Sequence, residues 1–122
     1  MKRKKSILLA ECVLDLADLL ASYLTKQGFD VSIATDGAIA KKKLLSSNFD
    51  FLITDVVMSE VDGVQLLTWL SQRELAINVV VSSGIKFELL PLFNEKGVIM
   101  KLSKPYTKER LVDLVAILKK TK

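Results

Sequence analysis

Histidine is absent from this chain of 122 residues, and cysteine occurs only once. A lone cysteine cannot form an internal disulfide bond, so nothing in the composition indicates an oxidising compartment. No stretch approaches the roughly 18 apolar residues of a membrane span, which argues against insertion in a bilayer. With no histidine and no second domain to close a substrate cleft, a small hydrolase or phosphatase is a distant interpretation. No G-x-G-x-x-G motif follows any expected strand, so a dinucleotide-binding domain is weaker still.

Half of the residues are hydrophobic and 26% are charged, which predicts a compact core rather than disorder. We expect a single cytoplasmic domain over residues 1–122, with basic, frayed tails at 1–5 and 119–122. These tails hold seven of the 18 basic residues, so the segment between them has 11 basic against 14 acidic residues. Because it has no basic stripe with interleaved aromatic residues, we do not expect this domain to bind nucleic acid.

Short apolar runs alternate along the chain with segments of helical spacing. The runs at 7–10, 31–34, 51–54, 78–82 and 98–102 predict five strands. Helical spacing follows four of them, at 13–24, 39–46, 64–70 and 111–118. Between the fourth and fifth strands, Pro91 interrupts the segment KFELLPLFNEKG, so we expect a late-starting or distorted helix there. Thr107 is the candidate N-cap of the last helix.

Five strands alternating with helices, three of them lacking a polar face, predict a parallel sheet that is covered on both sides. Right-handed crossovers leave few arrangements, and the expected fold is a doubly wound α/β sandwich. In such folds, chemistry gathers at the carboxyl ends of the strands. The polar residues that follow the apolar runs should therefore lie together. They are Glu11, Cys12, Asp55, Ser83 and Lys104.

Two acids, a hydroxyl and an ammonium at one edge of a sheet fit phosphoryl transfer to a carboxylate. A hard cation such as Mg²⁺, bound by carboxylate and carbonyl oxygens, offsets the charge of the acid and of the incoming phosphate. Lysine pairs with the phosphate, and a serine hydroxyl can donate to it. Singly, each residue has an ordinary explanation: a strand-end aspartate is often a turn or cap residue, and a lysine is often a surface charge. The ordered set is far more specific than any member.

These residues resemble the receiver domain of two-component response regulators, the family of the chemotaxis regulator CheY. LITDVVMSEVDG resembles the family's phosphoacceptor strand and loop, VVVSSG its fourth strand, and KLSKPY the segment with its lysine and an often cis proline. The resemblance covers essentially the whole chain and implies a flavodoxin-like (βα)5 fold with strand order 2-1-3-4-5. It implies Asp55 as phosphoacceptor, Ser83 and Lys104 as phosphate contacts, and the Val57 backbone carbonyl as a metal ligand beside Glu11 and Asp55.

Two positions depart from the family pattern. Cys12 stands where the family has a second metal-binding acid, and a soft sulfur is a poor ligand for Mg²⁺. Glu11 can act directly or through water, so we expect weak Mg²⁺ binding rather than none. Lys101 stands where the family often has an aromatic residue that turns inward on activation, and an ammonium resists that burial. We expect Lys101 to stay in solvent, so that the switch runs through Ser83 and the segment at 84–93.

The interpretation we favour is a receiver that accepts a phosphoryl group from a histidine kinase or phosphotransfer protein on Asp55. It would signal through a change of its surface and would not be an enzyme beyond its own phosphorylation and dephosphorylation. The alternative is a pseudo-receiver that keeps the fold and binds partners without being phosphorylated, which Cys12 supports. By the resemblance, and because FELLPLF is strongly apolar, a downstream protein or a second copy would dock on the fourth helix, fifth strand and fifth helix.

Overall fold

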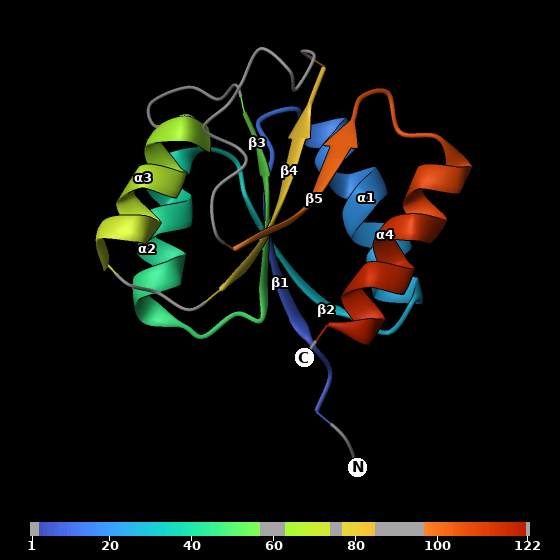
Figure 1. The fold of residues 1–122 in the computed structure, drawn as a ribbon, viewed down its shortest axis with the longest axis horizontal. Helices are drawn as coiled ribbons and strands as arrows, with labels where there is room; N and C mark the ends of the chain where they lie inside the picture. The colour runs from blue at the N-terminus through green and yellow to red at the C-terminus, as the bar shows by residue number, and fades with distance from the viewer. Residues whose placement is uncertain (1–2, 57–62, 74–76, 85–96, 122) are drawn as a thin grey trace.

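The computed structural model describes residues 3–56, 63–73, 77–84 and 97–121. Its five strands are all paired in parallel, in the order β2-β1-β3-β4-β5, as Figure 1 shows. They are β1 (Ser6–Ala10), β2 (Asp30–Ala34), β3 (Phe51–Asp55), β4 (Asn78–Ser83) and β5 (Val98–Ser103). The expected doubly wound sheet with strand order 2-1-3-4-5 is confirmed.

Four helices belong to the described part of the chain. They are α1 (Leu14–Lys26), α2 (Gly37–Ser46), α3 (Gly63–Arg73) and α4 (Lys108–Lys120). The last of these is the helix expected after the fifth strand. The helix expected around Pro91, and with it most of the anticipated docking face, lies outside the described residues. No helix in the described ranges has both the length and the apolar character needed to cross a membrane.

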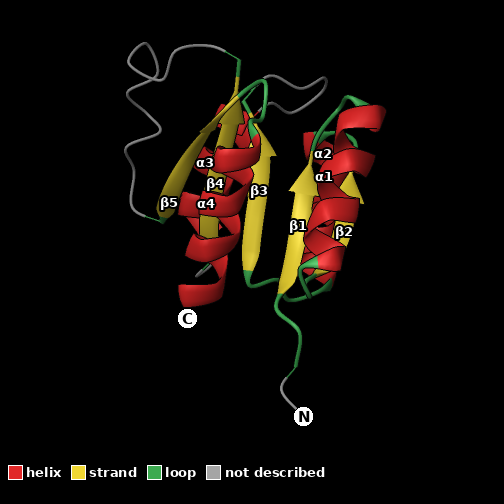
Figure 2. Ribbon diagram, turned by 90° about the vertical axis from the view of Figure 1, so that its right-hand side faces the viewer, coloured by secondary structure: helices red, strands yellow, loops and turns green. Residues whose placement is uncertain are grey.

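Of the four described helices, two cover each face of the sheet: Figure 1 shows the two pairs on opposite sides of it, and Figure 2 shows the face that carries α1 and α4 toward the viewer. Helices α1 and α4 pack on one face, where Leu20, Leu24 and Leu114 are buried against the sheet. Helices α2 and α3 pack on the other, where Leu44 and Leu66 are buried. Because both faces are covered, β3 is buried along its whole length, which explains why its sequence shows no polar alternation.

The helix starts are specified by side chains before the first turn. Asp36 accepts a hydrogen bond from Ile39 N at 2.9 Å, and Thr107 accepts one from Arg110 N at 3.2 Å. The N-cap expected at Thr107 is therefore confirmed. Val13 differs from the expectation: its helical spacing suggests a core position, but it is the N-cap of α1 and is 52% exposed.

The chain's first described residues contact both the sheet and the last helix, which differs from the solvated tails expected there. The Arg3 guanidinium donates to both carboxylate oxygens of Asp50, at 3.1 and 3.2 Å. Lys5 Nζ donates to the carbonyls of Leu118, Lys119 and Thr121 at 2.6–2.9 Å. These carbonyls lie at the end of α4, where a helix has acceptors without an internal partner and favours a cation. Lys5 therefore joins the start of β1 to the end of α4.

Candidate functional site

Three strand ends bring two acids and a lysine into direct contact. Lys104 Nζ lies 2.6 Å from Glu11 Oε1 and 2.8 Å from Asp55 Oδ2. Glu11 directly follows β1, Asp55 ends β3, and Lys104 directly follows β5. The expectation that these three residues meet at the carboxyl edge of the sheet is confirmed.

Glu11 is held from both sides of its carboxylate. Its Oε2 accepts a hydrogen bond from Val13 N at 3.1 Å, while Oε1 accepts the Lys104 ammonium. Its own backbone N–H donates to the Ala34 carbonyl at the end of β2. A carboxylate at this position also accepts a hydrogen bond from a backbone donor at the start of α1. Its negative charge is stabilised by the positive end of the helix dipole. Glu11 is only 2% exposed, so its orientation is fixed by these contacts.

The two carboxylates and the ammonium form a compact, partly buried charge cluster. Asp55 is 7% exposed, whereas the Lys104 side chain is 18% exposed. Burial acts to lower the pKa of Lys104, but hydrogen bonds and attraction from Asp55 and Glu11 outweigh it and raise that pKa above its usual value. Lys104 therefore stays charged and neutralises one of the two negative charges beside it.

Cys12 lies at the exposed rim of this cluster. One ligand atom each from Glu11, Cys12 and Asp55 lie within 4.8 Å of one another. Burial raises the pKa of the Cys12 thiol, and the negative charges of Glu11 and Asp55 raise it further. The thiol is therefore uncharged at neutral pH, where the family's acid would carry a full negative charge.

The other sequence-predicted positions lie around this cluster with different degrees of contact. Ser83 ends β4, is 2% exposed, and its carbonyl accepts a hydrogen bond from Lys104 N at 2.9 Å. Lys101 lies in β5 and is partly exposed; its carbonyl accepts from Arg110 Nη2 at 2.9 Å. The Lys104–Pro105 peptide bond is cis, in agreement with the resemblance. Val57, the expected carbonyl ligand, lies outside the described residues.

Sequence reasoning missed a second polar pair beside the cluster. Ser82 Oγ and Tyr106 Oη form a hydrogen bond of 2.6 Å, and either oxygen could be the donor. Ser82 is 1% exposed, and burial raises the pKa of the Tyr106 phenol. The only hints in the sequence are the serine doublet that ends the fourth apolar run and the tyrosine two residues after Lys104.

Residues 7–116 match the family model described as the response regulator receiver domain. The chain belongs to this family. It is a response regulator receiver domain of two-component signalling, with the CheY-like fold expected from its sequence.

Relatives of this receiver differ in length and in name. It is 34% identical over 80 residues to the response regulator receiver protein CpdR of Brucella abortus, covering 66% of this chain and 67% of that protein. It is 30% identical over 114 residues to the probable transcriptional regulator ycf29 of Porphyra purpurea, covering 90% of this chain but only 54% of that protein. The receiver domain of the Francisella response regulator 1452 superposes with a TM-score of 0.86 at 25% identity, covering 98% of this chain and 100% of that one.

Receiver domains generally bind Mg²⁺ through acidic residues, and this receiver has an acidic cluster at the corresponding place. The carboxylates of Glu11 and Asp55 are the hard oxygen donors that Mg²⁺ takes. The Cys12 thiol is a soft donor and does not suit this ion. Two of the three clustered side chains thus fit a magnesium site.

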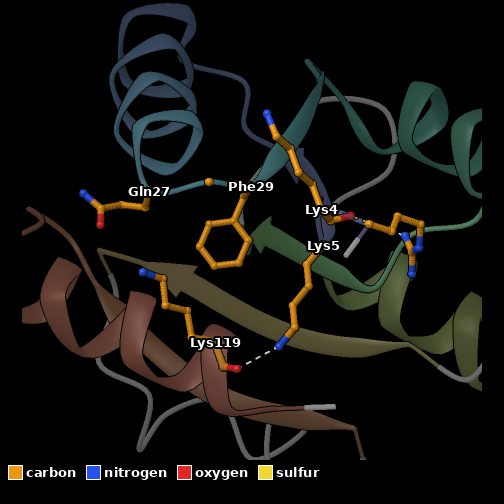
Figure 3. A pocket seen from close by; sticks show the side chains of 7 residues that line it. Lys4, Lys5, Gln27, Phe29 and Lys119 are labelled. Atoms are coloured by element: carbon orange, nitrogen blue, oxygen red, sulfur yellow. Dashed lines mark hydrogen bonds between the residues drawn. The ribbon is translucent and has the colours of Figure 1, made fainter. Parts of the chain in front are cut away.

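A hollow at the opposite end of the sheet carries positive rather than negative charge. Arg3, Lys4, Lys5 and Lys119 are among the residues that line it, around the edge of Phe29 (Figure 3). Two of the cations already have partners within the receiver, because Arg3 pairs with Asp50 and Lys5 donates to the end of α4. The hollow is therefore part of the packing of the chain's first residues against the rest of the fold.

Proposed function

We propose that this receiver accepts a phosphoryl group on Asp55 from a phosphohistidine of a histidine kinase or phosphotransfer protein. The observation that carries this proposal is the contact of Lys104 Nζ with both Asp55 and Glu11 at a buried strand edge. A lysine held against two acids is ready to balance the charge of a phosphoryl group that arrives on one of them. Membership of the family supports the same assignment.

The transfer exchanges one bond to phosphorus for another. A carboxylate oxygen of Asp55 attacks the phosphorus, and the bond from phosphorus to the imidazole nitrogen breaks. The electron pair of that bond stays on the imidazole, and an acyl phosphate forms on Asp55. Dephosphorylation ends the signal. Water attacks the phosphorus, the bond between Asp55 and phosphorus breaks, and inorganic phosphate leaves while the Asp55 carboxylate is restored.

The surrounding side chains have distinct roles in this proposal. Lys104 moves its pairing from the Asp55 carboxylate to a phosphoryl oxygen, while the hydroxyl of Ser83 donates to another. Glu11 and Asp55 would hold Mg²⁺, together with the Val57 carbonyl, and Cys12 contributes less than the usual acid. When bound, the cation offsets the negative charge that accumulates between the acids and the phosphoryl group.

We further propose that catalysis by this chain is limited to its own phosphorylation and dephosphorylation. Receiver domains in two-component systems interact with kinases or phosphotransfer proteins and with downstream effectors. For this chain, we propose that the output is a changed surface that a partner or a second copy reads. The specific docking face, which we expect at the helix around Pro91, at β5 and at α4, stays a prediction.

Intact-mass measurement tests the proposal directly. After incubation with acetyl phosphate and Mg²⁺, we expect the wild-type mass to increase by one phosphoryl group, and Asp55→Asn to show no increase. Asp18→Asn, an exposed aspartate on α1, is the matched control and should be labelled like the wild type. Label that survives Asp55→Asn would overturn the assignment of the acceptor. A folded wild-type protein that takes no label would instead be an interaction module, the alternative that Cys12 suggests.

A further inference from the structure

The Ser82–Tyr106 hydrogen bond lies on the same side of the sheet as the acidic cluster. Asp55 and Ser82 are Cα partners in the β3–β4 ladder, and neighbouring residues in register project to the same face. The adjacent backbone is also joined there, since Val56 N donates to the Ser82 carbonyl at 3.0 Å. Ser82 is therefore the strand-register neighbour of Asp55 in β4.

Tyr106 connects this neighbour to the last helix. Its ring packs against the core cluster formed with α1 and α4, and its hydroxyl reaches Ser82 Oγ at 2.6 Å. The next residue, Thr107, is the N-cap of α4 and accepts from Arg110 N. Arg110 in turn donates to the Lys101 carbonyl in β5. A displacement of the Tyr106 ring would therefore act on the first turn of α4, which follows the loop after β5 in Figure 1.

The Tyr106 hydroxyl also senses the charges of the cluster. Burial has the largest effect on the pKa of Tyr106 and raises it, and the hydrogen bond with Ser82 has the next largest effect. The charges of Lys104, Glu11 and Asp55 also act on this pKa. Burial in a low-dielectric region strengthens such interactions. An added phosphoryl group, together with the accompanying shift of Lys104, therefore changes the field at this hydroxyl.

We propose that Ser82 and Tyr106 are positioning residues that transmit the charge state of Asp55 to the start of α4. The inference rests on the proposed function, because phosphorylation of Asp55 is the event it reports. It also assigns the response to a residue other than Lys101. This residue is Tyr106, the aromatic two positions after Lys104, on the face covered by α1 and α4. The Lys101 side chain needs no inward turn in this arrangement.

Fluorine NMR can follow the two tyrosines of the chain separately. Both are replaced by a fluorinated tyrosine, and Tyr23→Phe and Tyr106→Phe assign the two signals. Tyr23 is the internal control, since it is partly buried against the same core cluster. We expect beryllofluoride with Mg²⁺, a mimic of the phosphoryl group, to shift the Tyr106 signal more than the Tyr23 signal. Asp55→Asn alone should also shift the Tyr106 signal, because it removes one negative charge.

Ser82→Ala tests the link itself. It should move the resting Tyr106 signal and reduce the further shift that beryllofluoride causes. Amide exchange gives a second readout: beryllofluoride should change protection at the start of α4, and Tyr106→Phe, which keeps the ring but removes the hydroxyl, should reduce that change. A merely structural tyrosine would pack equally well as phenylalanine and would leave the exchange response intact.

Two results would overturn the inference. One is a Tyr106 signal that neither beryllofluoride nor Asp55→Asn moves; the other is a Ser82→Ala response equal to that of the wild type. Intact mass after acetyl phosphate is measured on the same samples and judges the proposed function separately. If no phosphoryl group is taken up, the Asp55→Asn arm alone decides whether Tyr106 senses the charge at Asp55.

Discussion

At the scale of single residues, Cys12 is one of the two positions, with Lys101, that depart from the pattern the sequence resembles. The structure places its sulfur among the ligand atoms of Glu11 and Asp55, at the exposed rim of the cluster. The raised pKa keeps that sulfur protonated, so it adds neither charge nor a hard oxygen to the site. The two carboxylates of the cluster, Glu11 and Asp55, both form ion pairs with Lys104. The affinity for Mg²⁺ should be lower than the same site would have with an acid at position 12.

Replacing Cys12 by aspartate should therefore strengthen Mg²⁺ binding. We expect a gain of about 1–3 kcal/mol, the scale of one added contact to a charged group. Isothermal titration calorimetry of the wild type and Cys12→Asp measures the difference, and Cys12→Ser is the control that removes the sulfur without adding charge. Equal affinities in the wild type and Cys12→Asp would mean that Glu11 already supplies the missing contact.

The residues of the cluster could be predicted because strand ends converge, whereas their hydrogen bonds could not. Asp55 and Lys104 follow apolar runs, and parallel strands end at one edge. The contact of Glu11 with the Val13 N–H depends on the exact path of the chain into α1, which periodicity does not reveal. The same holds for Ser82 and Tyr106, which are 24 positions apart and meet only through the register of β4 and the turn after β5.

At the scale of elements, α4 shows how a local signal fixes a boundary. Thr107 was predictable as its N-cap because a side-chain oxygen before an apolar-periodic segment satisfies a backbone donor of the first turn. Val13 was misleading because an apolar residue one turn before Ala17 continues the helical period, although its own side chain points into solvent. Strands were easier, since β1, β3 and β4 are apolar runs that only a doubly covered sheet can bury.

Loss of the α4 cap should destabilise the receiver measurably. Thr107→Ala removes the acceptor for Arg110 N, and we expect it to lower the free energy of unfolding by about 0.5–2 kcal/mol. Thr107→Ser retains the hydroxyl and should stay close to the wild type. Urea denaturation measures the three proteins, and amide exchange locates the effect. A Thr107→Ala protein as stable as Thr107→Ser would show that the cap contributes little.

At the scale of the whole molecule, charge is divided between the two ends of the sheet. The acids Glu11 and Asp55 lie at the carboxyl ends of the strands, and the basic residues of the chain's start lie at the amino ends, near Asp50. Burial acts to raise the pKa of Asp50, but hydrogen bonds from Arg3 and Ser6 and the Arg3 charge outweigh it and lower that pKa. The stabilisation from Asp50 is therefore present above the unfolded-state pKa of about 3.9 and disappears as the pH falls through the folded-state value.

Asp50→Asn should consequently destabilise the receiver near neutral pH and have a smaller effect in acid. We expect about 1 kcal/mol at pH 7, a modest figure because the ion pair with Arg3 is largely solvent-exposed. The difference from the wild type should shrink below about pH 4. Urea denaturation across this range checks the prediction, with Asp18→Asn as the surface control. A difference that is undiminished in acid would mean that the charge of Asp50 is not the source of its stabilisation.

The bond from Lys5 to the end of α4 has a mechanical consequence. The start of β1 and the end of α4 lie at the same end of the sheet, so a force that pulls them apart acts first on the three carbonyl contacts of Lys5. Once these part, the load passes along the axis of β1. That strand is paired on both sides, with β2 and with β3, so its hydrogen bonds are loaded in shear and share the force. The Lys5 contacts should therefore break at a low force, and the paired strand β1 should resist a much higher one.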